Sequence, residues 1–378
     1  MKILQKKYTK DTGWEILRGD KLNPELYNFV LAFGSTELLS QPSIYKSIQD
    51  SYPNATIIIN STAGEISGTQ VSDNSISLTA IYFEKTTLKP AATHINSVKN
   101  SYEAGKDLAL SLEQVGLKNV LVISDGQKVN GSELVDGLQK HLANGIIITG
   151  GLAGDGSNFK RTLVGLNEPP LEGRIVAVGF YGNDLNIAYG SKGGWDSFGP
   201  DRLITKSKAN VLYELDNKPV LDIYKMYLGE YAKELPSSGL LFPLSIRNGD
   251  NNSLVRTILS INEDEKSMTF AGNMPEGHYA RLMKANFDKL IEGASLAAQN
   301  SVNNTKQKPD LAILISCVGR KLVLNQRVEE EIEVVRGVYG DKTVITGFYS
   351  YGEISPSNDF STCDLHNQTM TITTFSEE

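Results

Sequence analysis

Three stretches of this chain repeat one order of apolar and polar positions. In each, an apolar run ends at a small polar residue, a segment with helical periodicity follows, and a second apolar run enters a turn of glycine and an acidic residue. The paired apolar runs cover residues 30–35 and 57–60, 120–124 and 146–149, and 311–316 and 344–346. A further apolar run follows each turn, at residues 76–83, 175–181 and 370–375. Such repetition predicts three copies of one supersecondary unit.

The segments between the paired runs have the pattern of amphipathic helices. Leu134, Leu138 and Leu142 recur every four residues in the second copy, which places them on one helical face. In the third copy the expected solvent face carries Glu329, Glu330, Glu331 and Glu333. Two more helices are predicted at 102–115 and 281–298. The strands are continuously apolar, which is typical of sheets covered on both faces. The pattern therefore predicts an α/β fold of strand–helix–strand–corner–strand units, with layered sheets and helices on the outer faces.

Residues 183–240 interrupt this order. They contain a glycine-rich stretch, then a predicted strand at 210–215, a polar turn and a predicted helix at 220–231. Polar turns of this kind are common at domain boundaries. We therefore predict two domains, residues 1–218 and 219–378.

Composition restricts the classes of function. The net charge is −7 and the pI is near 5.4, whereas a nucleic-acid-binding protein needs a basic face. The first residues lack the apolar segment of a signal peptide, and no apolar run approaches the ~18 residues of a membrane span. Two cysteines, Cys317 and Cys363, do not make a disulfide framework. These features predict a cytoplasmic protein with no membrane insertion and no nucleic-acid partner.

The glycine–acidic turns are the first candidate sites, because α/β proteins bind ligands where strands end. Each turn contributes one carboxylate, from Glu65, Asp155 and Glu353. Such carboxylates could bind an amino group or transfer protons, or they could accept hydrogen bonds from their own turn. We expect the second, structural role for at least one of them.

The second turn is the richest in glycine, with the sequence GGLAGDG at residues 150–156. Its glycines allow backbone to approach a ligand closely, and successive N–H groups in such a loop form an anion nest. The loop lacks the lysine of a P-loop and the following helix of a dinucleotide fingerprint. The candidate ligand contacts in and after this loop are Gly151, Gly154, Asp155, Asn158 and Arg161. The alternative is a tight corner between strands that contacts no ligand.

The third repeat adds further candidates. Tyr349 and Tyr351 flank Glu353 and supply apolar walls with a polar tip. Arg320 follows the first strand of the same repeat, and parallel neighbours in such a unit end on one side of the sheet. Arg320 and Glu353 are therefore expected to face one pocket, where they would bind the carboxylate and the ammonium group of an amino acid. The alternative is that they pair with each other as scaffold. For Cys317 we expect a buried, unreactive role.

Trp195 and the four histidines are the remaining candidate site residues. Trp195 follows two glycines in a polar loop, where it either roofs a pocket or fills a gap between domains. The four histidines are not spaced as zinc ligands and no cysteine pair accompanies them, so no metal site is predicted. His278, just before the helix predicted at 281–298, is the candidate axial ligand if heme is bound. The alternative for His278 is a surface position at the start of that helix.

Several segments together resemble the FIST family. They are GGLAGDG at 150–156, Gly-Gly-Trp at 193–195, LDNKPVLDIYKMYLG at 215–229, CVGR at 317–320, YGEIS at 351–355 and LHNQT at 365–369. The resemblance covers nearly the whole chain and implies an N-terminal and a C-terminal FIST domain. It further implies a bacterial sensory protein that binds a small ligand, amino acids being the usual suggestion. It favours ligand contact at the second turn. The implied partners are histidine kinases, chemoreceptors or cyclic-dinucleotide enzymes, and some stand-alone members bind heme and sense nitric oxide.

We therefore expect a cytoplasmic sensor that is not an enzyme and carries no cofactor. It would bind a small polar, amino-acid-like metabolite between or within its two FIST domains and act on a separate signalling protein. A heme-binding nitric oxide sensor is the alternative. An enzyme with Glu353 or Asp155 as base ranks last, because the sequence offers no nucleophile with a base and an orienting group.

Overall fold

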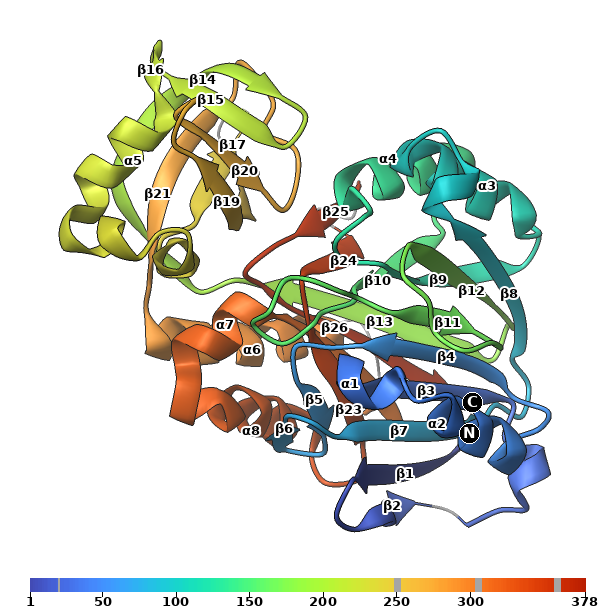
Figure 1. Ribbon diagram of the computed structural model, residues 1–378. Coiled ribbons are helices and arrows are strands. Elements are labelled where there is room, and N and C mark those ends of the chain that lie inside the picture. The colour runs from blue at the N-terminus through green and yellow to red at the C-terminus, as the bar shows by residue number, and fades with distance from the viewer. Residues whose placement is uncertain (20, 248–252, 303–307, 357–361) are drawn as a thin grey trace.

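The computed structural model describes residues 1–19, 21–247, 253–302, 308–356 and 362–378. Within them, three six-stranded sheets form one body and an eight-stranded sheet forms a second (Figure 1). The first sheet has the order β11 (Val164–Leu166), β4 (Thr56–Ser61), β3 (Phe29–Gly34), β7 (Ile76–Tyr82), β1 (Lys2–Thr9) and β2 (Gly13–Gly19). The second has the order β25 (Cys363–His366), β24 (Gly352–Pro356), β10 (Ile147–Leu152), β9 (Leu117–Ser124), β12 (Arg174–Tyr181) and β8 (Thr87–His94). The third has the order β13 (Leu185–Lys192), β26 (Met370–Glu377), β22 (Leu311–Cys317), β23 (Val344–Ser350), β5 (Glu65–Ser67) and β6 (Gln70–Ser72).

The short strand after each glycine–acidic corner leaves its own repeat and joins a neighbouring sheet. β5 of the first repeat pairs with β23 of the third, β24 of the third pairs with β10 of the second, and β11 of the second pairs with β4 of the first. This closed exchange ties the three sheets around one apolar core. Aromatic rings meet across that core, with centroids 4.9 Å apart for Phe33 and Phe348 and 5.1 Å apart for Phe180 and Phe375. We call this body the three-sheet body.

Helices cover the outer faces of the three sheets, as the apolar pattern predicts (Figure 1). They are α1 (Thr36–Leu39) and α2 (Pro42–Ser51), α3 (Ser101–Ser111) and α4 (Gly131–His141), and α6 (Phe287–Val302), α7 (Val318–Leu324) and α8 (Val328–Tyr339). Asn130 caps α4 by accepting hydrogen bonds from the N–H groups of Ser132 and Glu133, which is the role of a good N-cap residue. The predicted α/β class with layered sheets and outer helices is confirmed.

Residues 195–285 form the second body, inserted in the chain between β13 and α6 and seen at the upper left of Figure 1. Its strands are β18 (Ser253–Arg256), β17 (Leu244–Arg247), β21 (Tyr279–Ala285), β14 (Trp195–Lys208), β15 (Val211–Leu215), β20 (Ser267–Phe270) and β19 (Ile258–Asn262), with β16 (Lys218–Pro219) beside β15. Helix α5 (Val220–Leu228) packs on them through its buried side. The chain enters and leaves side by side, because Trp195 pairs with Ala285. The domain boundary that the sequence suggested, near residue 218, falls inside this inserted body at β16.

One expectation about an individual element is wrong. Residues 281–285 belong to strand β21, and the helix expected from 281 begins only at Phe287. The apolar residues of this segment fit either a helix or a strand, and the pairing of β21 with both β14 and β17 makes it a strand. At the start of the chain, β1 pairs with β7 and β2 and buries Ile3 and Leu4.

Candidate functional site

The three glycine–acidic corners meet at one place in the three-sheet body. Three backbone hydrogen bonds join them in a cycle: Ala63 N–H to the Tyr349 carbonyl (2.8 Å), Gly154 N–H to the Ser61 carbonyl (3.0 Å) and Tyr351 N–H to the Leu152 carbonyl (3.2 Å). Gly154 is needed because a Cβ there would lie 2.7 Å from the backbone nitrogen of Ala63. The close backbone approach that the sequence suggested is therefore made to another corner of the protein.

Glu65 and Glu353 occupy equivalent positions and have equivalent partners. Each is buried and accepts a hydrogen bond from the hydroxyl three residues earlier, at 2.6 Å in both cases. Glu65 also accepts hydrogen bonds from the N–H and the hydroxyl of Ser75, and Glu353 accepts them from the N–H and the hydroxyl of Thr369. Ser75 and Thr369 each lie just before the next core strand. Burial raises the pKa of Glu65 to about 7 and that of Glu353 to about 8, against the lowering effect of these donors. Their hydrogen bonds fasten each corner to the strand that follows it.

The second repeat divides this task between two aspartates. Asp155 accepts from the backbone N–H of Arg161 at 3.2 Å and so closes its own loop. The link to the next strand comes instead from Asp125, which accepts from the N–H of Gly173 at 2.6 Å, just before β12. Asp125 follows β9 and lies outside the glycine–acidic turn, so no sequence pattern groups it with the corner carboxylates.

Arg320 is fully buried and pairs with Glu331, and not with Glu353 as the alternative interpretation had it. Its Nε and Nη2 both donate to Glu331 Oε2, at 3.1 and 2.8 Å. The guanidinium also donates to the backbone carbonyls of Gly193 and Leu290, and Tyr349 donates to the other Glu331 oxygen at 2.6 Å. Glu331, expected on the solvent side of its helix, faces inward because α8 packs under α6 and the end of β22.

The other residues singled out from the sequence also have protein partners. Trp195 donates from Nε1 to the Gln368 carbonyl at 2.9 Å and packs beside Leu290 and Val323 at the neck between the bodies. Arg161 lies at the surface and pairs with Glu172. Gly151 lies in β10 and is the strand partner of Glu353. The hydroxyl of Tyr351 forms hydrogen bonds with Gly156 and Phe159. Asn158 lines an apolar cavity described below. The ligand-binding role of this set stays a prediction.

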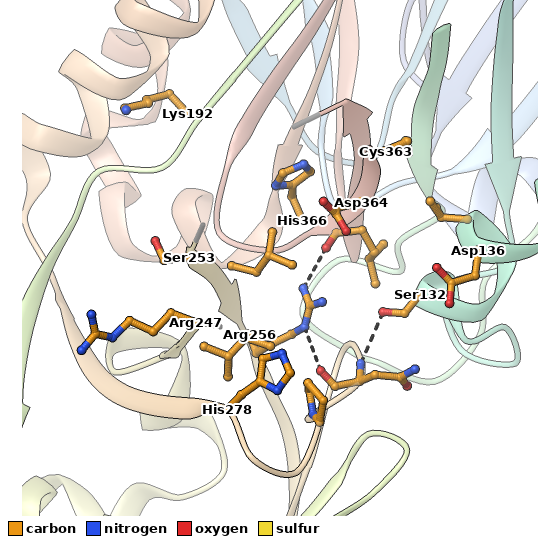
Figure 2. Close-up of a pocket in the computed structure, with 16 residues that line it drawn as sticks. Ser132, Asp136, Lys192, Arg247, Ser253, Arg256, His278, Cys363, Asp364 and His366 are labelled. Atoms are coloured by element: carbon orange, nitrogen blue, oxygen red, sulfur yellow. Dashed lines mark hydrogen bonds between the residues drawn. The ribbon is translucent and has the colours of Figure 1, made fainter. Parts of the chain in front are cut away.

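A cleft of about 610 Å³ lies between the inserted body and the three-sheet body. Figure 2 shows its lining side chains, which come from α4, β25, the end of β13, the β17–β18 hairpin and the loop before β21. Its volume lies within the ~300–1,000 Å³ of small-molecule sites, which occur preferentially between domains. Of the residues proposed from the sequence, His278 lines this cleft and the ten ligand-contact candidates do not.

Arg256 lies at the centre of the cleft and joins the two bodies. Its Nη1 donates to the carbonyl of Leu365 in β25 at 2.7 Å, and its Nε donates to that of Asn273 at 3.3 Å. Asn273 in turn accepts from Asn130 and donates to Ser132 at the start of α4. Burial lowers the pKa of Arg256 to about 10, against the opposing effect of Asp364, so its guanidinium remains charged at neutral pH.

The two walls of the cleft differ in charge. Figure 2 shows Arg247 and His278 on the inserted body, whereas Asp136 and Asp364 project from the three-sheet body, with Arg256 between them. Burial raises the pKa of Asp136, an effect that Lys140 opposes and Asp364 reinforces. A ligand that spans the cleft therefore meets Arg247 and Arg256 from the inserted body and the carboxylates of Asp136 and Asp364 from the three-sheet body, to which Lys192 at the end of β13 adds one cation.

His366 lines the cleft, and two buried amide residues that are not among its lining residues follow it in the chain. A carbonyl can only accept, so His366 donates from Nε2 to Ser355 at 3.1 Å, which leaves Nδ1 as an acceptor. Burial lowers the pKa of His366, which keeps the ring neutral at neutral pH. Asn367 and Gln368 are fully buried, and their side-chain amides have no partner among the described residues. Water or a polar ligand group is the usual partner of such amides.

Sequence reasoning found little of this cleft. His278 was proposed for heme alone, and His366 stood only inside the segment LHNQT. The remaining charged groups, Asp136, Lys192, Arg247, Arg256 and Asp364, come from segments far apart in the chain. Only the folded structure brings these residues together, and no motif or spacing in the sequence predicts that they are neighbours.

The fold and the cleft together define a two-body α/β protein with a cleft of small-molecule size between its bodies. Residues 28–218 match the FIST N domain and residues 221–356 match the FIST C domain. The chain belongs to the FIST family, whose domains are sensory domains of signal transduction and not catalytic ones. It is also 25% identical over 223 residues to an uncharacterized protein of Methanocaldococcus jannaschii, a match that covers 52% of this chain and 40% of the relative. Among the described residues, no helix has the length and apolar character needed to cross a membrane.

Proposed function

We propose that this protein is a sensor for a small zwitterionic metabolite, an amino acid or a close analogue, bound in the cleft around Arg256. The observation that carries the proposal is the division of charge between the walls. The ligand carboxylate would lie near Arg256 and Arg247, and its ammonium group near Asp136 and Asp364. Charge-assisted hydrogen bonds of this kind are among the strongest that proteins make.

Binding of this kind would change how the two bodies sit together. A zwitterion contacts both walls at once, so it favours the arrangement in which the walls are closest. The shift cannot exceed the difference in the ligand's affinity for the open and closed arrangements. We propose that a separate signalling protein, such as a histidine kinase, a chemoreceptor or a cyclic-dinucleotide enzyme, responds to this closure in the cytoplasm. The role is that of a binding protein without catalysis or cofactor.

The test is a binding screen on the full chain. Twenty amino acids are screened by thermal shift, and hits are measured by calorimetry in the wild type, Arg256→Lys and Asp364→Asn. We expect at least one hit whose affinity falls by about 1–3 kcal/mol in each variant, the scale of a hydrogen bond to a charged group. Arg161→Lys is the matched control, because Arg161 is an arginine outside the cleft.

Two results would count against the cleft. Absence of any saturable amino acid would remove the proposed ligand class. An affinity lowered by Arg161→Lys and untouched by both cleft variants would move the site to the second glycine–acidic corner. Asp364→Asn keeps the test informative even if Arg256→Lys destabilises the junction between the bodies.

Heme remains the second candidate because His278 lines the same cleft as Arg247 and Lys192. An imidazole could ligate the iron and the cations could pair with propionates. The fit is incomplete because a porphyrin needs extended apolar walls. Among the described residues, the apolar side chains that line the cleft are Val135, Ile246, Leu254, Pro275 and Leu365. The zwitterion is therefore the better match.

A further inference from the structure

A second cavity of about 610 Å³ lies on the other side of the neck and shares no lining residue with the charged cleft. Its apolar walls are Phe159, Leu240, Leu241, Ile258, Leu322 and Val323. Among the described residues that line it there is no lysine, arginine or histidine. The charged residue among those described lining residues is Glu234, which is exposed, so the lining is mainly apolar where that of the cleft is charged.

Three separate parts of the fold build this cavity. Leu322 and Val323 belong to α7, Phe159 follows the second glycine–acidic corner, and Leu241 and Ile258 belong to the inserted body. Both bodies therefore contribute, as they do to the charged cleft. Ligand cavities occur preferentially at such junctions.

The wall formed by Phe159 is held in place before any ligand arrives. Its φ is +53°, an unusual value for a bulky residue, and its ring stacks on Tyr351 with centroids 4.6 Å apart. Tyr351 also accepts from the Phe159 N–H at 3.1 Å and donates to the Gly156 carbonyl at 3.2 Å. Strained backbone that the surroundings maintain is often found at ligand sites. Two residues proposed from the sequence therefore lie at this cavity. Asn158 lines it, and Tyr351 supports the ring of Phe159.

We propose that this cavity is a second ligand site, for a neutral small molecule with an aromatic or branched aliphatic body. The apolar walls favour such a body by burial, and Ser157 and Asn158 at the lining can accept or donate hydrogen bonds. An anion finds no cation among the lining residues. The inference is independent of the function proposed for the charged cleft, because the two sites have no residue in common.

The two sites are nevertheless close in the chain. Arg256 lines the charged cleft and Ile258 lines the apolar cavity, so the β18–β19 junction separates them. A molecule in either site contacts the same segment of the inserted body.

The experiment uses indole as the probe and the full chain with labelled leucine and valine methyl groups. We expect the methyl signals of Leu322 and Val323 to shift saturably, with a dissociation constant at or below about 1 mM, as for other small apolar ligands. Leu322→Asp should weaken binding at least tenfold, because a carboxylate would enter an apolar wall. Leu322 is 41% exposed, so this change is compatible with folding.

Met226→Asp is the matched control, since Met226 is an exposed apolar residue of α5 outside the cavity. It should leave indole binding unchanged. Leu322→Trp is a second variant that should fill the cavity and abolish the shift at Val323. Shifts that do not saturate, or a dissociation constant within twofold of the wild type in both Leu322 variants, would overturn the proposal. Neither result would bear on amino acid binding in the cleft.

Discussion

Arg256 donates a hydrogen bond from Nη1 to the backbone carbonyl of Leu365 at 2.7 Å, and so fastens the inserted body to strand β25 of the three-sheet body. A buried cation thus stands where the two bodies touch and where the charged cleft opens. A ligand that engaged this guanidinium would act directly on the junction. In the proposed function, the same group would therefore both bind the ligand and change the arrangement of the bodies.

Glu353→Gln should flatten the dependence of stability on pH. Burial raises the pKa of Glu353 in the folded protein to about 8, whereas an unfolded glutamate titrates near ~4.3. The folded state therefore binds more protons between these values, so the contribution of Glu353 to stability is fully present below about pH 4 and declines as pH rises toward 8. The loss attributable to this group over that whole range is on the order of 5 kcal/mol.

Urea unfolding at pH 5, 7 and 9 measures this effect. The variant should lose less stability than the wild type over that range. Glu333→Gln on the outer side of α8 is the control and should follow the wild type. Parallel curves for wild type and Glu353→Gln would show that Glu353 titrates as an ordinary carboxyl.

Arg320 and Glu331 should be strongly coupled in stability. Both side chains are fully buried, so removing one leaves the other as an unpaired buried charge. We expect Arg320→Met and Glu331→Leu each to lower the free energy of unfolding by about 3–5 kcal/mol. The double variant should lose clearly less than the sum of the two, which a double-mutant cycle in urea measures. Additive losses would mean that the pair does not interact as the geometry indicates.

Gly154→Ala should destabilise the three-sheet body without changing amino acid affinity. The added Cβ would lie 2.7 Å from the backbone nitrogen of Ala63, so the two corners must move apart. We expect a loss of about 1–3 kcal/mol, as for other overpacked positions. Gly337→Ala in α8 is the control, because nothing lies within 4 Å of its added Cβ. Loss of ligand binding in a folded Gly154→Ala protein would return the second corner to the list of ligand contacts.

The heme alternative can be decided by absorbance. We expect protein purified from heme-replete cells to carry no Soret band of stoichiometric intensity. If such a band is present, His278→Ala and, as control, His94→Ala should be compared. Loss of the band in His278→Ala alone would establish heme in the cleft and replace the zwitterion as the primary ligand.

The sequence by itself determined the local units of this protein. Continuous apolar runs such as 311–316 became core strands and the leucines of α4 became its buried face, because periodicity and side-chain size act within a few residues. It also located the three corners, because glycine can adopt the backbone conformations that a tight turn needs and a neighbouring carboxylate can accept hydrogen bonds from that turn. The family resemblance of these segments was confirmed by the domain matches.

The tertiary structure alone decided how the units combine. The exchange of β5, β11 and β24 among sheets depends on backbone pairing between distant segments, and backbone groups carry no sequence signature. Glu331 became the partner of Arg320 because helix packing turned it inward. The cleft unites Asp136, Arg256 and Asp364 from three separate elements, so its charge pattern exists only once the inserted body is docked.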